Sequence, residues 1–291
     1  MNKADMYMSE SINNIFKNGY KDVNPRPKYE DGSPAHTFSV NHVVRRYDLS
    51  EGQFPICTLR PIAWKTGIRE IFTIYQKPTN VISEMEEMKV NWWKPWDIGD
   101  GTIGQRYGAT VKRYDLVKNL IKDIKEDPYG RRKVMSLWQE TDLRETEGLA
   151  PCAFLTIWNV RNDVITNKEY LDMCLIQRSG DMLTASGAGC MNEVQYAALL
   201  MMIARHTGYE AGVFTHFIAN EQIYDRHIEQ AEEILKRYKD LEMHEFYGKH
   251  IETPKLILNP DKTDFFEMTI DDFEMIDYEP IKPQISLPLG I

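Results

Sequence analysis

The sequence is poor in cysteine, and its four cysteines show none of the spacings that metal sites and disulfide frameworks require. They are Cys57, Cys152, Cys174 and Cys190, far apart in 291 residues and without a Cys-x-x-Cys pair. The seven histidines also lack metal-ligand spacing. These absences argue against a zinc site and structural disulfides, and they are typical of a reducing cytoplasm. We therefore expect a cytoplasmic protein without a metal.

Long apolar runs and an excess of positive charge are missing too. No apolar run approaches the length of a membrane span, and the segment from Met1 to Asp5 has no hydrophobic signal-peptide core. The formal net charge is -9, so the overall field of the protein does not attract nucleic acid or an anionic membrane. We expect no membrane or nucleic-acid partner, and any phosphate site must be a local cluster of arginines and lysines.

The apolar pattern changes between helical and strand periodicity along the chain, without repeats. Helices are predicted at 4–18, 62–76, 115–126, 193–206 and 226–237. Strands are predicted at 38–47, 133–138, 152–161, 169–177, 213–218 and 255–258. Asn192 and Asp225 are expected to cap the last two helices. Helices and strands interleave without strict βαβ alternation, which favours the α+β class, and 42% hydrophobic residues supply an ample core.

One thiol has a distinctive position. Cys152 follows Pro151 and precedes the apolar run from Ala153 to Trp158. Proline cannot donate a hydrogen bond to a strand ladder, so it suits the start of a strand, and the thiol should lie at the mouth of that strand. Most cysteines only pack as small hydrophobes. The hypothesis of a nucleophile therefore depends on cations near Cys152, which would lower the pKa of its thiol.

Several cationic and amide side chains could complete such a site. Five arginines lie near turns or strand ends, namely Arg26, Arg60, Arg131, Arg132 and Arg178. Guanidinium groups bind phosphate dianions bidentately and favour a nearby thiolate, although an exposed arginine is more often a solvated surface charge. The amide of Asn192 offers a donor and an acceptor, which match the adjacent C=O and N–H of a uracil edge. Together these residues support the hypothesis of a pyrimidine nucleotide site, with a nucleophilic cysteine, arginines that bind the phosphate and an asparagine that hydrogen-bonds to the base.

Further candidates lie near apolar faces. Glu70 falls beside the inner face of the 62–76 helix, where a carboxylate is usually a solvated flanking group. Trp92, Trp93 and Trp96 lie close together, and such clusters are more often core or lid packing than a platform for a ligand. Tyr107 follows a glycine-rich loop at 97–104.

These residues occur in segments that resemble the thymidylate synthase family, in order and close to that family's spacing. The segments are Arg131-Arg132, Trp138, Leu149-Ala150-Pro151-Cys152, Gln177-Arg178-Ser179-x-Asp181, Asn192-x-x-x-Tyr196 and Ile223-Tyr224. The similarity runs from about residue 4 to Ile291. It implies one catalytic domain over 1–291, and a homodimer with a large β-sheet packed sheet to sheet and helices outside. It also implies reductive methylation of dUMP to dTMP by 5,10-methylenetetrahydrofolate, without a metal.

The resemblance implies a catalytic role for five residues. Cys152 would attack C6 of the uracil, and Arg178 would favour its thiolate. Asn192 would read the uracil edge, and Glu70 would organise water and proton transfer. Tyr107 would assist the removal of the proton from C5.

The resemblance also implies two sets of ligand contacts. The dUMP contacts would be Arg26, Arg131, Arg132, Arg178, Ser179, Asp181, Asn192, Gln222 and Tyr224. The folate contacts would be Arg60, Trp93, Trp96, Asp181 and Ile291. Arg131 and Arg132 would reach the phosphate from the partner subunit, and the carboxylate of Ile291 would help to close the site.

The sequence departs from the family pattern around the uracil edge. Ala153 stands where many members carry histidine after the cysteine, and Gln222 replaces a histidine two residues before Tyr224. Ala219-Asn220 replaces a usual Gly-Asp, and three extra residues lie between Asp181 and Asn192. Two alternatives stay open at this point. One is a pyrimidine nucleotide hydroxymethylase, in which water replaces the hydride, and the other is a catalytically silent homologue.

Overall fold

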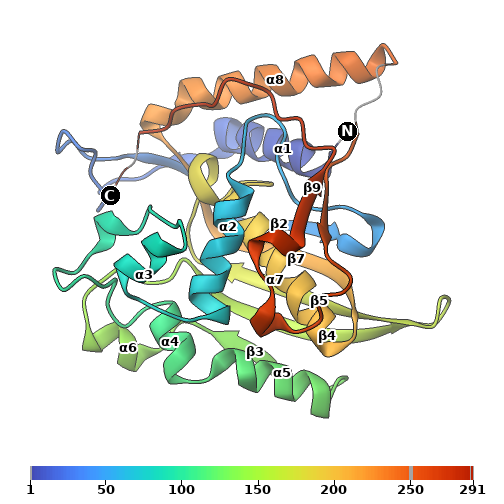
Figure 1. The fold of residues 1–291 in the computed structure, drawn as a ribbon. Helices are drawn as coiled ribbons and strands as arrows, with labels where there is room; N and C mark the ends of the chain where they lie inside the picture. The colour runs from blue at the N-terminus through green and yellow to red at the C-terminus, as the bar shows by residue number, and fades with distance from the viewer. Residues whose placement is uncertain (1, 249–251, 289, 291) are drawn as a thin grey trace.

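A mixed β-sheet with helices packed against one face forms the framework of the computed structural model, which describes residues 2–248, 252–288 and 290 (Figure 1). The strands of this sheet are β1 (Tyr20–Lys21), β2 (Thr37–Asp48), β3 (Lys133–Ser136), β4 (Ala153–Asp163), β5 (Lys168–Gln177), β6 (Gly180–Asp181) and β7 (Glu210–Tyr224). The helices are α1 (Lys3–Asn18), α2 (Trp64–Ile71), α3 (Ile82–Glu87), α4 (Gly108–Arg113), α5 (Leu116–Glu126), α6 (Glu140–Glu145), α7 (Met191–Thr207) and α8 (Ile228–Phe246). A separate small sheet pairs β8 (Lys255–Leu258) with β9 (Phe273–Ile276).

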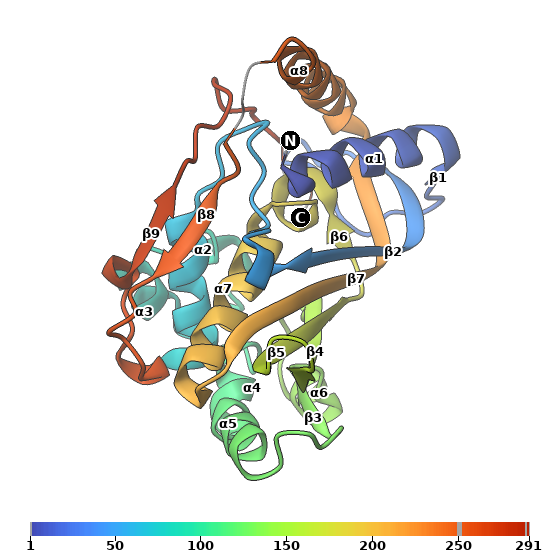
Figure 2. The ribbon, with the colours of Figure 1, turned by 90° about the vertical axis from the view of Figure 1, so that its right-hand side faces the viewer.

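The order of the strands brings distant segments of the chain together. The sheet runs β1-β2-β7-β5-β4-β3, and β6 pairs with β7 (Figure 2). β7 is parallel to β5 and β6, whereas the other neighbours are antiparallel. In the β4–β5 hairpin, Ala153 lies opposite Gln177. The residues that flank this pair, Cys152 and Arg178, are therefore neighbours at one end of the sheet.

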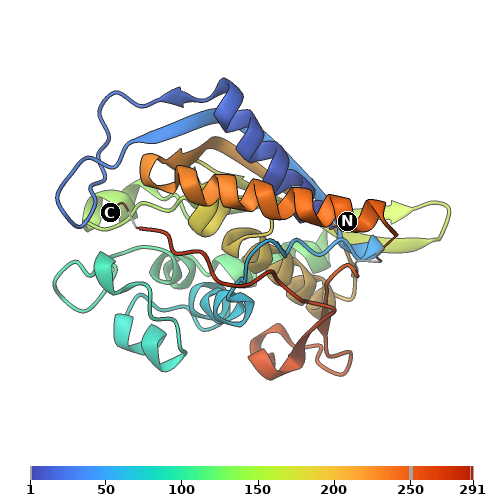
Figure 3. The ribbon, with the colours of Figure 1, turned by 90° about the horizontal axis from the view of Figure 1, so that it is seen from above.

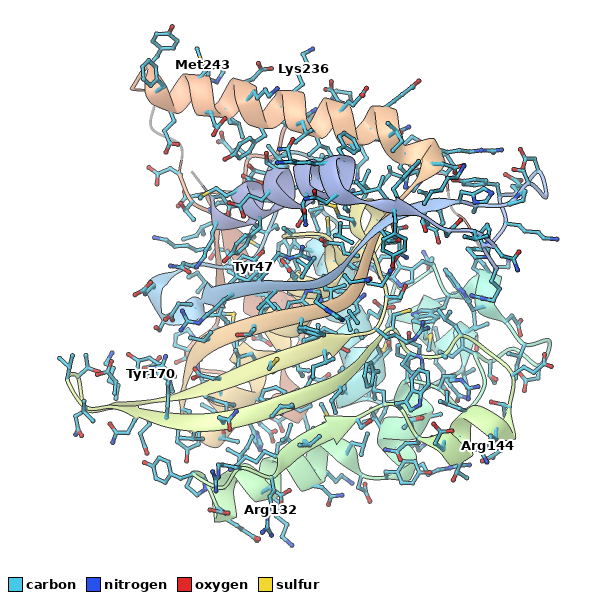
Figure 4. All side chains as sticks on the ribbon, turned by 180° about the vertical axis from the view of Figure 1, so that it is seen from behind. Tyr47, Arg132, Arg144, Tyr170, Lys236 and Met243 are labelled. Carbon is cyan, nitrogen blue, oxygen red and sulfur yellow. The ribbon has the colours of Figure 1, made fainter. Side chains whose placement is uncertain are left out.

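Helices cover the sheet unequally. α2 and α7 pack on one face, and α1 and α8 lie side by side near the β1–β2 end (Figures 1 and 3). α7 is apolar nearly all round because it is enclosed between α2 and the sheet. Seen from behind, the sheet faces the viewer, and no helix of the described chain crosses it (Figure 4).

The secondary structure confirms most of the predicted helices and strands, with differences at their ends. The helix predicted at 62–76 is α2 followed by a π-helical turn at Phe72–Gln76, and the strand predicted at 213–218 is the middle of the longer β7. The helix predicted at 226–237 extends to Phe246, and Asp225 lies in a 3₁₀ turn before it rather than capping it. β9, the partner of β8, was not predicted.

The predicted helix cap at Asn192 is wrong. α7 begins at Met191, with Cys190 at its N-cap, so Asn192 lies inside the first turn. The intrinsic preference of asparagine for a cap is overridden because its side chain makes tertiary hydrogen bonds instead.

The main cluster of buried apolar side chains is continuous from Ala4 of α1 to Phe273 of β9. This continuity supports one domain over residues 1–291, a division of the chain that stays a prediction. Within the described ranges, none of the helices has the length and the apolar content that crossing a membrane requires. The same residues contain no group of three or more metal-ligating side chains.

Candidate active site

The β4–β5 hairpin places a thiol against a guanidinium. The backbone N–H of Arg178 donates to the carbonyl of Cys152 at 3.0 Å, and its Nη2 lies 3.4 Å from Cys152 Sγ. The side chain is held by the carbonyls of Pro151 and Ala150, which accept from Nε at 2.9 Å and from Nη2 at 2.7 Å. The guanidinium also lies over the Trp138 ring, 5.8 Å from its centroid. Arg178 is therefore fixed beside the thiol before any ligand binds.

Burial outweighs the cations in setting the protonation of the thiol. It raises the pKa of Cys152, while the charges of Arg178 and Arg26 oppose that change. Arg178 and Arg26 thus lower the pKa of Cys152 in the direction expected from the sequence, but burial has the larger effect. The free protein holds this group mainly as a thiol at neutral pH.

Two tyrosines share the surroundings of Cys152. Tyr107 is 8% exposed, and burial raises its pKa well above the ordinary value, with Cys152 adding to the increase and a backbone hydrogen bond from Cys152 opposing it. Burial, followed by the charges of Asp181 and Cys152, raises the pKa of Tyr224 to about 12, while Arg26 opposes this increase. Both side chains are neutral phenols near the thiol, so they act as hydrogen-bond donors at neutral pH.

Glu70 is buried, contrary to the usual solvated position of such a carboxylate. Its Oε1 accepts from the indole N–H groups of Trp92 at 2.7 Å and Trp93 at 2.5 Å, and its Oε2 accepts from the Gln195 amide. Burial raises the pKa of Glu70, and these three donors oppose the increase. The tryptophan cluster therefore packs around a candidate catalytic group and also donates hydrogen bonds to it.

Asn192 and Glu70 are linked through a residue that sequence reasoning missed. Asn192 Nδ2 donates to Gln195 Oε1 at 3.0 Å, and the amide of Gln195 donates to Glu70. On its other side, Asn192 Oδ1 accepts from Ser186 Oγ at 2.9 Å and from Gln177 Nε2 at 3.3 Å. The available signal was that Gln195 follows Asn192 by three residues on α7, which places both on one helix face.

Ser179, Asp181 and Gln222 lie together where β5, β6 and β7 meet. Gln222 Nε2 donates to Ser179 Oγ at 3.2 Å, and Asp181 lies opposite Gln222 in the ladder of β6 and β7. The Asp181 carboxylate accepts from the hydroxyl of Thr184, and burial raises its pKa.

Aromatic side chains and the C-terminal segment border the site. Trp93 meets the ring of Tyr107 at 4.9 Å and that of Trp96 at 5.7 Å between centroids, and Trp96 is only half-buried. Gly290 packs so closely on Tyr224 that a Cβ at this position would lie 2.9 Å from the ring. Ile291, the predicted closing residue, lies outside the described residues.

Comparison with known proteins identifies the family. A family model described as thymidylate synthase matches residues 6–291. The chain belongs to the thymidylate synthase family. Similar proteins include the thymidylate synthases of Lactococcus lactis subsp. cremoris (46% identical over 293 residues) and Streptococcus pneumoniae (44% over 294), each matched over 100% of both chains. The solved thermostable thymidylate synthase A of Bacillus subtilis superposes with a TM-score of 0.86 at 31% identity, covering 99% of each chain.

Membership of the thymidylate synthase family bears on the function predicted from sequence. It confirms the predicted methylation of dUMP to dTMP with 5,10-methylenetetrahydrofolate and favours it over hydroxymethylation. The fold class is confirmed as well, since the chain has a large mixed sheet with helices and superposes on the Bacillus enzyme over nearly its whole length. The packing of this sheet across a dimer interface stays a prediction.

One predicted folate contact, Arg60, is buried. Arg60 is 5% exposed, and its Nη2 donates to the carbonyls of Leu183 at 2.5 Å and Thr184 at 3.3 Å. These internal acceptors hold the guanidinium inside the protein, so Arg60 is not a surface cation, and its contact with a folate stays a prediction. The sequence position alone could not reveal this burial.

Arg131 and Arg132 do not reach Cys152 of their own chain. Both are exposed, and they precede Lys133, which lies opposite Trp158 of β4. Trp158 is six residues beyond Cys152, which corresponds to roughly 20 Å along a strand. Figure 4 shows Arg132 pointing away from the body of the protein, at the edge of the sheet.

The electrostatics of Cys152 predict how its reactivity depends on pH. Its alkylation by iodoacetamide in the free protein should increase through an apparent pKa above that of an ordinary cysteine, since only the thiolate reacts. Arg178→Ala removes a favourable positive charge and should raise this pKa further, slowing alkylation at pH 7.5 about tenfold, which is the effect of one pKa unit. Peptide mass spectrometry can measure the rate at Cys152.

Arg205→Ala provides the control for this experiment. Arg205 lies near the other end of α7, roughly 20 Å along the helix from Asn192. It should leave the pH profile unchanged. A faster reaction at neutral pH in Arg178→Ala would contradict the assigned role of the guanidinium.

Proposed function

We propose that this thymidylate synthase methylates dUMP by covalent catalysis, with Cys152 as the nucleophile. The observation that carries the proposal is the 3.4 Å contact between Cys152 Sγ and Arg178 Nη2 at the open end of the hairpin. Addition of the thiolate forms the S–C6 bond and moves the electrons of the C5=C6 bond toward O4. C5 thereby becomes electron-rich, and one difficult step is divided into two easier ones.

The charge on O4 requires prearranged donors. Asn192 can donate an N–H to this oxygen, and Glu70 can hold a water beside it, since Gln195 links the two side chains. Donors fixed in a buried site stabilise developing charge without reorganisation. Burial raises the pKa of Glu70, which brings this carboxyl group nearer to the range in which general acid–base groups exchange protons.

Tyr107 supports the removal of the proton from C5. Because burial keeps its phenol neutral, Tyr107 is not itself the base at neutral pH. We assign it the role of donating a hydrogen bond to a water that accepts the proton. Its position beside Cys152 and Trp93 supports this role.

The folate fits an aromatic wall beside Glu70. Trp93 and Trp96 would contact it, because Trp96 is half-buried and leaves ring surface for stacking, and Asp181 offers an acceptor for the N–H donors of a pterin edge. When bound, 5,10-methylenetetrahydrofolate supplies the one-carbon unit and then the hydride that completes the methyl group. The indole rings and the C-terminal segment against Tyr224 would exclude water from the reacting carbon.

The nucleotide would be held by both subunits of a homodimer. Arg26, Arg178 and Ser179 would bind the phosphate from the same chain as Cys152, and Tyr224 would bind the ribose, with Gln222 supporting Ser179. Arg131 and Arg132 would come from the partner. Their exposure, their distance from their own Cys152 and the open face of the sheet support this arrangement.

The products of the reaction test the proposed chemistry. With dUMP and 5,10-methylenetetrahydrofolate, the wild-type protein should form dTMP and dihydrofolate in equal amounts, whereas Cys152→Ser should form neither. The departures at Ala153 and Gln222 leave the thiol and Arg178 intact, so they should not change the product. Chromatography of the nucleotides and the folates can measure both. A hydroxymethylated nucleotide without dihydrofolate would support the hydroxymethylase alternative, and no product would support the silent one.

Mixing two impaired variants tests the shared site. Cys152→Ser and Arg132→Ala homodimers should each be impaired, and subunit exchange should restore about one quarter of wild-type activity, because about half of the dimers are mixed and each has one intact site. Steady-state assays after verified exchange measure the recovery.

The matched control combines Cys152→Ser with Arg178→Ala. Arg178 contacts Cys152 of its own chain, so every site in the mixed dimer carries a defect and activity should not return. Equal recovery in both mixtures, or none in either, argues against the contribution of Arg132 from the partner.

A further inference from the structure

A buried cluster of charged side chains lies behind Asn192 and takes no part in the proposed chemistry. Arg45, Glu193, His216 and Glu221 are each at most 1% exposed. Arg45 donates from Nε to Glu193 Oε1 and from Nη1 to Glu221 Oε1, both at 2.6 Å. His216 lies between Glu193 and Gln177, so this cluster touches the network that holds Asn192.

Glu193 is an ionised acceptor in this cluster. Its Oε2 accepts from the Tyr47 hydroxyl at 2.6 Å and from the Gly189 N–H at 2.7 Å, and its Oε1 accepts from Arg45. Burial raises the pKa of Glu193, but Arg45 and the hydrogen bonds outweigh burial and lower it to about 2. Glu193 therefore has no proton to give to His216, whose Nδ1 lies 3.0 Å from Oε1.

The second ring nitrogen of His216 also faces an acceptor. His216 Nε2 lies 3.0 Å from Gln177 Oε1. The orientation of the Gln177 amide is fixed, because its Nε2 lies 2.9 Å from the carbonyl oxygen of Ser179, which can only accept. With acceptors on both sides, only a doubly protonated ring can donate to each of them.

The charges around the ring balance in this state. Burial, assisted by Arg45, lowers the pKa of His216 below its ordinary value, and Glu193 and Glu221 oppose this decrease without cancelling it. The hydrogen-bond geometry, with an acceptor at 3.0 Å from each ring nitrogen, nevertheless favours the charged ring. With an imidazolium, one guanidinium and two carboxylates, the cluster has no net charge. A neutral ring would instead leave a buried excess negative charge and an acceptor facing another acceptor at 3.0 Å, and both are costly inside a protein.

We propose that His216 is a buried imidazolium that fixes the amide orientation of Gln177 and, through it, that of Asn192, and so selects uracil over cytosine. The proposal rests on the proposed role of Asn192 as the pyrimidine reader. Gln177 Nε2 donates to the carbonyl oxygen of Ser179 at 2.9 Å and to Ser186 Oγ at 2.7 Å. Ser186 Oγ donates in turn to Asn192 Oδ1 at 2.9 Å. Asn192 Oδ1 is thus occupied by Ser186, with Gln177 Nε2 at 3.3 Å, and one hydrogen of Asn192 Nδ2 is taken by Gln195. What remains for a ligand is an N–H donor, which suits O4 of uracil and rejects the 4-amino group of cytosine.

A neutral ring would favour the opposite arrangement. Gln177 would turn its amide to donate to His216, at the expense of its bond to Ser179, and its oxygen would then face Asn192. Asn192 would turn in response and present Oδ1, an acceptor that suits the amino group of cytosine. His216 is thus a positioning residue whose charge is coupled to the choice of pyrimidine.

Neutron diffraction on deuterium-exchanged crystals of the wild-type protein tests the charge directly. We expect deuterium on both ring nitrogens of His216 at pH 7.5, and deuterium on the Asn192 atom that faces Gln195. A singly deuterated ring, or the reverse orientation of the Gln177 amide, would overturn the proposal. This result does not depend on whether any variant folds.

Nucleotide binding to two matched variants tests the consequence. In His216→Phe, the ratio of the dUMP and dCMP affinities, measured by calorimetry, should fall at least tenfold relative to the wild type. Tyr47→Phe removes a hydrogen bond to the same Glu193 carboxylate without touching Gln177, and should leave the ratio within twofold. Equal losses in both variants, or no loss in His216→Phe, would contradict the proposal. A failure of the proposed function would instead appear as absence of dTMP formation by the wild type.

Discussion

The pairing of β4 with β5 is the constraint on which the site depends. It places Ala153 opposite Gln177, so that Cys152 and Arg178 become neighbours although 26 positions separate them. The two residues before Cys152, Ala150 and Pro151, supply the carbonyls that hold the guanidinium. The parallel pairing of β7 with β5 and β6 then adds Gln222 and Tyr224 at the same end of the sheet. The thiol, its cation and the predicted nucleotide contacts thus follow from the register of one sheet, rather than from any local motif.

Burial is the second influence on the chemistry, and it acts on the reacting groups in one direction. It raises the pKa of Cys152, Glu70 and Tyr107 alike. Burial therefore keeps the Cys152 thiol protonated in the free protein and makes the Glu70 carboxylate easier to protonate than an exposed one. The low local dielectric that opposes ionisation also strengthens the contacts of Arg178 and Asn192 with charge that develops in the substrate. The positive charges therefore matter most once the nucleotide is bound and water is excluded.

Much of the fold could be predicted from the sequence, because apolar periodicity indicates its helices and strands, and short motifs single out the residues proposed to react. The β4–β5 hairpin, α7 and the position of Cys152 directly before β4 depend on local patterns of apolar residues and proline. The hydrogen-bond partners could not be predicted in this way. Gln195 and Gln177 acquire their roles only when α7, α2 and β5 meet, and Glu70 becomes buried because two indoles fold over it. Asn192 is not a cap and the guanidinium of Arg60 is buried against backbone carbonyls, because tertiary contacts decide both positions.

The central claim is that Cys152, activated beside Arg178, adds to the pyrimidine and makes the hydrogen on C5 exchangeable. Tritium release from dUMP labelled at C5 measures this step most directly. The account predicts that the wild-type protein releases tritium to water when 5,10-methylenetetrahydrofolate is present, in step with dTMP formation, and that Cys152→Ser releases none. Release by Cys152→Ser at the wild-type rate would contradict the claim, because C5 would then be activated without the thiol.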